Sequence, residues 1–166
     1  GRGPKPEVFE KCFASWKQYM PDFQIIEWNE DNFDIHCCRY VEQAASVEKW
    51  SFVSDYVRFY AINKYGGIYF DTDMEVIKSF NPLLEQDFFC CLEGENVVAT
   101  CVVAAKPQHI LCREMLAYYQ DRPFCKNGKL DMKPNTVIFT DMGTMRIYVP
   151  SFINNAQKMA QQSNPI

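Results

Sequence analysis

The chain has little of what membrane-spanning, nucleic-acid-binding or secreted proteins need. Its longest apolar run, residues 97–105, has Thr100 inside it and is too short to cross a bilayer. The net charge of −4 argues against nucleic-acid or anionic-membrane binding, which needs a basic face. Residues 1–6 lack the apolar stretch of a secretory signal. We therefore expect no transmembrane segment and no nucleic-acid partner, whereas peripheral association with the inner face of a membrane stays open.

Zinc-site and glycosylation patterns are also missing. No two cysteines are separated by two residues, so a structural zinc site is not expected, and no Asn-x-Ser/Thr sequon occurs. The sequence does hold eight cysteines, but four of them form two adjacent pairs, one of which lies in the apolar run 88–92. A free cysteine behaves as a small apolar residue, and a chain of this length does not need disulfides to fold. We expect mostly free thiols and a reducing, cytoplasmic environment.

What the sequence does have is a regular alternation of helical and extended patterns. Apolar spacing and start and stop signals predict helices over residues 6–20, 40–50, 51–64, 108–120 and 151–162. Strands are predicted over residues 23–28, 68–71, 88–92, 97–104 and 137–140, with a further extended piece over 74–77. Strands that alternate with helices in a chain of 166 residues predict a single α/β domain spanning residues 1–166.

The most informative stretch begins with Ser-Asp-x-x-Arg on a predicted helix. Asp55 and Arg58 are three residues apart, so both project from one face of that helix. Such a pair is usually a surface ion pair, but the residues after it favour a functional interpretation. Gly66 and Gly67 end the helix and allow a close backbone approach before a short apolar strand.

That strand delivers two carboxylates, Asp71 and Asp73, in an Asp-x-Asp pair. Acidic residues at the carboxyl end of a strand in an α/β domain lie in the usual ligand crevice. Mn²⁺ and Mg²⁺ prefer carboxylate oxygens together with substrate phosphates over sites built from protein alone. The spacing therefore predicts a site for a divalent cation and a diphosphate.

The combined pattern, with Tyr-Gly-Gly-Ile-Tyr before the two aspartates, resembles the signature of glycosyltransferase family 32, which includes capsular-polysaccharide and mannosyl enzymes. The resemblance extends through residues 6–33 and 81–84 and covers most of residues 6 to about 110. It implies a GT-A-like (Rossmann-like) α/β/α sandwich with a mixed central sheet. The usual first strand and closing tryptophan element of the family are not recognisable, so we expect a domain truncated at both ends.

The resemblance also implies an activity. It would be metal-dependent transfer of a sugar from a UDP- or GDP-sugar donor to a saccharide or other acceptor, with retention at the anomeric carbon. Asp73 would bind the metal directly, and Asp71 would contact the ribose or sugar, partly through metal-bound water. The implied catalytic set is Asp55, Arg58, Asp71 and Asp73; the implied donor-binding set is Asp55, Arg58, Gly67, Tyr69 and Asp71.

Two other interpretations stay open from the sequence alone. The chain is either the transferase or a degenerate, non-catalytic member that keeps the fold and a sugar or nucleotide site. A phosphatase of the haloacid dehalogenase type also has an apolar strand ending in Asp-x-Asp. That motif expects Thr or Val two residues after the second aspartate, where this chain has Glu75. Metal-dependent UDP or GDP binding would separate the first two classes from the third.

Overall fold

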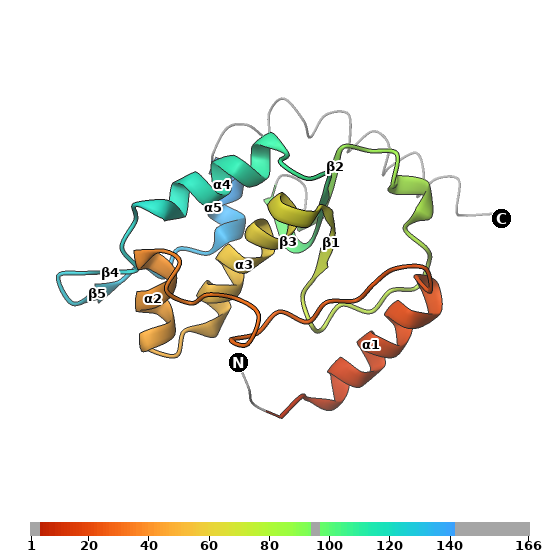
Figure 1. Ribbon diagram of the computed structural model, residues 1–166, viewed down its shortest axis with the longest axis horizontal. Coiled ribbons are helices and arrows are strands. Elements are labelled where there is room, and N and C mark those ends of the chain that lie inside the picture. The colour runs from red at the N-terminus through yellow and green to blue at the C-terminus, as the bar shows by residue number, and fades with distance from the viewer. Residues whose placement is uncertain (1–3, 94–96, 142–166) are drawn as a thin grey trace.

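The computed structural model describes residues 4–93 and 97–141, in which helices pack on both faces of a small sheet (Figure 1). The sheet has the strand order β1-β3-β2, and both of its pairings are antiparallel. A short hairpin, β4-β5, lies apart from it. The α/β class predicted from the sequence is confirmed. The strands are β1 (Gly67–Phe70), β2 (Phe88–Glu93), β3 (Val97–Ala105), β4 (Cys125–Lys126) and β5 (Lys129–Leu130).

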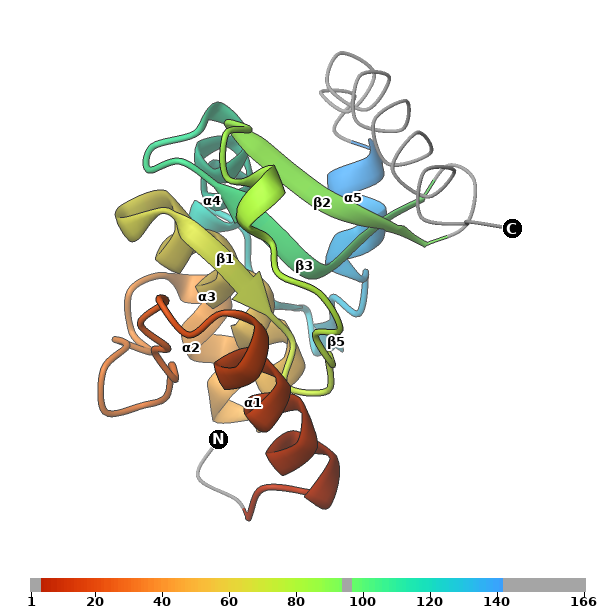
Figure 2. The same cartoon turned by 90° about the vertical axis from the view of Figure 1, so that its right-hand side faces the viewer.

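The helices divide the molecule into layers, as Figures 1 and 2 show. Helix α3 is buried on almost every side, and it packs against α2, α4 and the sheet. Helix α1 lies on the opposite side of β1, where Trp16 stacks on Phe70 with ring centroids 5.5 Å apart. The helices are α1 (Glu7–Tyr19), α2 (Arg39–Ser46), α3 (Trp50–Tyr65), α4 (Ile110–Gln120) and α5 (Asn135–Asp141), with a 3₁₀ turn at Asn81–Leu83.

Alternation along β1 assigns its side chains to the two layers. Ile68 and Phe70 belong to the small core under α1, whereas Tyr69 packs in the main core with α3. Because side chains alternate along an extended chain, Asp71 continues on the α3 side of the sheet. The backbone N–H of Asp71 donates to the carbonyl of Cys101 at 2.8 Å, so the β1–β3 ladder continues through this residue.

Helix α1 also fixes the chain just after the Asp-x-Asp pair. The indole Nε1 of Trp16 donates to the Met74 carbonyl at 2.7 Å, and the Ser15 hydroxyl accepts from the Val76 N–H at 2.9 Å. These two bonds replace the ladder that a strand over residues 74–77 would have made. The predicted extended piece is therefore not a strand here, because a helix, rather than another strand, satisfies its backbone.

Two of the predicted strands are wrong for related reasons. Residues 23–28 form no ladder with any described residue, and an apolar cavity of about 470 Å³ separates them from the open edge of β1. Residues 137–140 lie in helix α5, which begins after Pro134 and buries Ile138 and Phe139 against the main core. Apolar, β-prone residues form a strand only where a partner strand is available. The predicted helix 151–162 lies outside the described residues.

All eight cysteines are free, as the sequence predicts. Among the helices that the structure describes, none has the length and apolar character to cross a membrane.

Candidate active site

Helix α3 carries two charged residues into the interior. Asp55 and Arg58 are only 9% and 4% exposed, and Asp55 Oδ1 lies 3.0 Å from Arg58 Nη2. The sequence predicts this pair on one helical face, and the structure turns that face towards the sheet. Because an unpaired charge is costly to bury, the pair must find further partners inside the protein.

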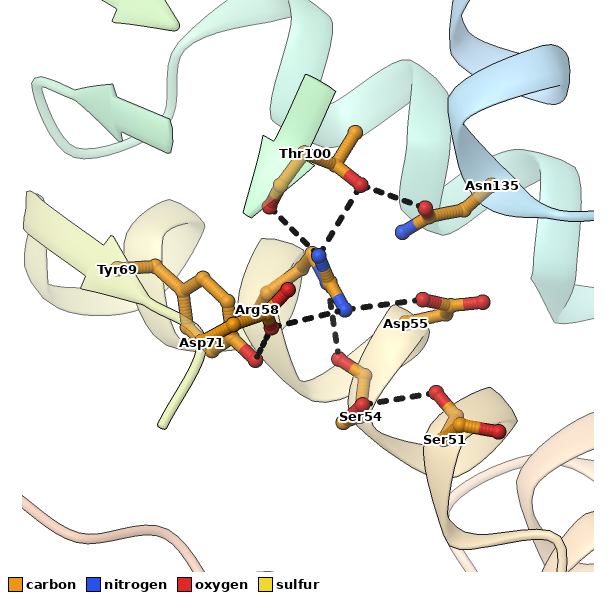
Figure 3. A network of polar contacts seen from close by, with 8 residues as sticks. All are labelled: Ser51, Ser54, Asp55, Arg58, Tyr69, Asp71, Thr100 and Asn135. Carbon is orange, nitrogen blue, oxygen red and sulfur yellow. Dashed lines mark hydrogen bonds and ion pairs between the residues drawn. The ribbon is translucent and has the colours of Figure 1, made fainter. Parts of the chain in front are cut away.

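The guanidinium of Arg58 finds them on three elements, as Figure 3 shows. Its Nε faces the Ser54 carbonyl at 3.4 Å, and Nη1 donates to both the carbonyl and the hydroxyl of Thr100, at 2.6 and 3.0 Å. Nη2 contacts Asp55 at 3.0 Å and Asp71 Oδ1 at 3.3 Å. A guanidinium has five N–H donors, and these contacts account for all five. Arg58 therefore ties α3 to β1 and β3 and has no donor left over.

Asp71 is the second carboxylate of the network and the more accessible one. Its side chain is 34% exposed, and its Oδ1 accepts from the Tyr69 hydroxyl at 2.7 Å as well as facing Arg58. The Tyr69 ring lies under the guanidinium, with Arg58 Cζ 4.8 Å from the ring centroid. Tyr69 thus orients Asp71 and Arg58 through its hydroxyl and ring. Tyr69 and Gly67 line the cavity of about 470 Å³ beside β1, not the separate cavity that Asp55 lines.

A bulge in β3 supplies the partners that sequence reasoning missed. The β2–β3 register passes from Cys90 opposite Val103 directly to Cys91 opposite Ala99, so residues 100–102 have no partner on β2. Freed from that ladder, Thr100 turns its carbonyl and hydroxyl to Arg58. Bulges next to functional sites often re-aim side chains in this way. The only signal in the sequence is a polar residue in the middle of a buried apolar run.

Asn135, the first residue of α5, is the second missed residue. Its Oδ1 lies 2.6 Å from Thr100 Oγ1, and its side chain is 4% exposed. The sequence predicts a strand close to this position, so nothing marked Asn135. A helix-start signal was present, because Pro134 followed by Asn and Thr is common where a helix begins.

These residues line a cavity of about 670 Å³. The start of α3, the residues just after β1, the bulged halves of β2 and β3 and the start of α5 form its walls. Asp55, Arg58 and Asp71 share this cavity, and Thr100 and Asn135 lie in the same wall network. Asp73 lies on the turn after β1, is exposed, and is not part of the lining. A volume of this size is typical of small-molecule sites.

Comparison with known proteins places the chain in a family. Residues 6–90, about half of the chain, match the family model of the glycosyltransferase sugar-binding region containing a DXD motif. The chain belongs to this family. No curated protein and no solved structure matches it. The matched residues of this DXD-motif glycosyltransferase include Asp55, Arg58, Asp71 and Asp73, whereas Thr100 and Asn135 lie beyond them.

The charges of this network do not balance when both of its carboxylates are ionised. Two carboxylates, Asp55 and Asp71, share the single guanidinium of Arg58. Burial is the main influence on Asp55; Arg58 opposes it and the charge of Asp71 adds to it, and together they raise the pKa of Asp55 to about 7. A proton on Asp55 relieves this imbalance, and a cation in the cavity would do the same for the ionised carboxylate.

The residues fit a metal that is held jointly with a ligand. Among the residues that the structure describes, no group of three His, Cys, Asp or Glu side chains could hold a metal ion. Asp71 and Asp73 lie on one turn, closed by the Met74 N–H donating to the Asp71 carbonyl at 3.1 Å. Two carboxylates on a turn suit a hard cation whose shell is completed by phosphate oxygens and water. They do not suit a site made of protein alone.

Proposed function

We propose that this chain transfers a sugar from a UDP- or GDP-sugar to a saccharide or other acceptor, in the manner of glycosyltransferase family 32. The observation that best supports this function is the network of Asp55, Arg58 and Asp71 on the wall of one cavity. Membership of the DXD-motif family supports a transferase, and the network supports a working one. Apolar residues would often stabilise the fold as well as a buried charged network does, so retention of this network suits a ligand site.

Each side chain has a part in this proposal. Asp71 and Asp73 would hold Mn²⁺ or Mg²⁺ against the diphosphate of the donor, which neutralises the charge that develops as the nucleotide leaves. Arg58 adds positive charge to the same wall and fixes Asp55 and Asp71 in place. Asp55 faces the transferred sugar, whose anomeric configuration is retained. We place the reaction in the cytoplasm, where free thiols persist.

The test is turnover with a panel of UDP- and GDP-sugars in the presence of Mn²⁺. Released nucleotide and labelled product on saccharide acceptors are measured with and without a chelator. Chelation should abolish turnover, and Asp73→Ala should lower it by about a hundredfold or more, the scale of lost charge stabilisation. Asp22→Ala, which removes another exposed carboxylate, is the matched control and should behave as the unaltered chain. Donor binding without any hydrolysis or transfer would support the non-catalytic alternative.

A further inference from the structure

The donors and acceptors around Arg58 fix how the Asn135 amide is oriented. Arg58 can only donate, so the Thr100 hydroxyl accepts from it, at 3.0 Å. The single hydrogen of that hydroxyl is then free to point to Asn135 Oδ1, 2.6 Å away. If the amide were flipped, its Nδ2 would face the Thr100 hydroxyl as a second donor beside Arg58, and the hydroxyl hydrogen would lose Asn135 Oδ1 as its acceptor. The network therefore directs Oδ1 to Thr100 and leaves Nδ2 on the other side of the amide (Figure 3).

That Nδ2 group is a buried donor without a partner. Asn135 is 4% exposed, and its Nδ2 makes no hydrogen bond within the part of the chain that the structure describes. Leaving a buried donor unsatisfied costs about 1–3 kcal/mol, so such groups are uncommon and often functional. Asn135 also lines the cavity that holds Asp55 and Asp71. The cavity wall therefore includes a residue with a fixed N–H donor that no described residue uses.

The neighbouring charge decides which group would bind there. Asp55 lines the same cavity, and its Oδ1 contacts Arg58 Nη2. The Nη1 atom of the same guanidinium bonds Thr100. A phosphate oxygen beside Asp55 would be repelled by the carboxylate. A hydroxyl has both functions that this corner requires, because it accepts from an amide N–H and donates to a carboxylate. The pair of Asn135 and Asp55 therefore matches a sugar hydroxyl rather than a diphosphate.

We propose that Asn135 binds the donor sugar, with its Nδ2–H donating to one hydroxyl of the sugar and the Asp55 carboxylate accepting from that same hydroxyl. This inference rests on the proposed function and adds a residue to it that lies outside residues 6–90. The roles of Arg58 and Asn135 then separate. The N–H groups of Arg58 contact other residues of the protein, whereas the amide N–H of Asn135 would bind the ligand.

Comparing the affinity for the sugar-nucleotide with the affinity for the nucleotide alone distinguishes contacts to the sugar from contacts to the diphosphate. In calorimetry with Mn²⁺, Asn135→Ala should weaken UDP-glucose or GDP-mannose, whichever the unaltered chain binds, by about tenfold, the scale of one lost hydrogen bond. UDP or GDP alone should bind within about twofold of the unaltered chain, which also shows that the variant is folded. Asn135→Asp keeps the acceptor for Thr100 and loses the donor, so it should lose at least as much sugar affinity. Val137→Ala, an exposed change on the same helix, should bind both ligands normally.

Monodeoxy donors identify the hydroxyl. For one position on the sugar, removing the hydroxyl and replacing Asn135 by Ala should cost no more together than either change alone, because both remove the same bond. Equal weakening of nucleotide and sugar-nucleotide would overturn the inference, and so would normal sugar binding by Asn135→Asp. If the unaltered chain binds no sugar-nucleotide with Mn²⁺, the proposed function itself fails and takes the inference with it.

Discussion

At the scale of the residue, one side chain organises the site. The sequence places Asp55 and Arg58 on one helical face, and the structure confirms it. The sequence could not show that Arg58 would also bond Thr100. That contact depends on a bulge about forty residues later in the chain, which is a tertiary feature with no local signal. The sequence singles out Asp71 because it follows the carboxyl end of a strand, and the structure puts it in contact with Arg58. The exposure of Asp73 was not, because it depends on the turn after β1.

The Arg58 network predicts that lysine is not an adequate replacement. A lysine has three donors on one nitrogen and cannot span Thr100, Asp55 and Asp71 at once. Arg58→Lys should therefore lower the free energy of unfolding by about 3 kcal/mol, the scale of a broken buried pair. Urea denaturation measures it. Arg113→Lys, on the exposed face of α4, is the control and should change stability by less than about 0.5 kcal/mol. Equal stabilities would show that the network is not a structural centre.

Asp55 predicts a particular pH dependence. Its pKa is raised to about 7, chiefly by burial, so the folded protein binds a proton there that the unfolded chain releases near pH 4. The contribution of this group to stability is complete below about pH 4 and is lost as the pH rises through 7. Without added metal, Asp55→Asn should therefore gain stability relative to the unaltered chain between about pH 5 and pH 8. Urea midpoints at both pH values measure the difference, and parallel profiles would contradict it.

At the scale of the element, the turn between α3 and β1 brings helix and strand together. Gly66 has φ +69° and donates its N–H to the Ile62 carbonyl at 2.7 Å, which ends α3. The chain then enters β1 directly, and this tight connection between α3 and β1 lets Arg58 contact Asp71. This return was predictable from the two glycines. The failed strands at residues 23–28 and 137–140 show the limit of such signals, since strand formation needs a partner that local sequence does not specify.

The two glycines of that turn should respond differently to alanine. A Cβ at Gly66 would lie 2.7 Å from Pro107 Cδ, whereas a Cβ at Gly67 would meet nothing within 4 Å. Both positions have positive φ, where an alanine is strained. Gly67→Ala is therefore the matched control for backbone strain alone. Gly66→Ala should be less stable than Gly67→Ala by about 1–3 kcal/mol, the usual penalty for overpacking. Thermal or urea unfolding of both variants decides it; equal losses would mean that Pro107 gives way without cost.

At the scale of the whole molecule, the site is an assembly of segments that are far apart in the sequence. Its walls come from α3, the turn after β1, both halves of the bulged β2–β3 pair and α5, while α1 holds the chain beyond the turn from the other side of the sheet. The family match ends at residue 90, before the bulge and before α5. A single sequence read for motifs therefore finds the first half of the site. The second half depends on how the sheet closes over α3.

Such an assembly predicts that metal and nucleotide stabilise the fold together. The described residues offer a cation few ligands, and a nucleotide alone would meet the two carboxylates of Asp55 and Asp71 with only the Arg58 guanidinium as counter-charge. Mn²⁺ with UDP or GDP should therefore raise the unfolding temperature by more than the sum of their separate effects. At a hundredfold excess over Kd, a ligand that binds only the folded state adds about 2.7 kcal/mol. Differential scanning fluorimetry with each component alone and combined measures the excess.

Variants of the Asp-x-Asp turn locate the origin of that excess. Asp73 is exposed on the turn, so Asp73→Ala should leave the unliganded protein as stable as before and abolish the metal-dependent part. Asp71→Ala should weaken the metal-dependent part less if Asp71 acts mainly on the ribose and sugar, but it also removes the partner of Tyr69 and Arg58 and so should lower the stability of the unliganded protein. Asp22→Ala should change neither quantity. A metal-dependent shift that survives in Asp73→Ala would place the cation away from Asp73 and would overturn the role assigned to this turn.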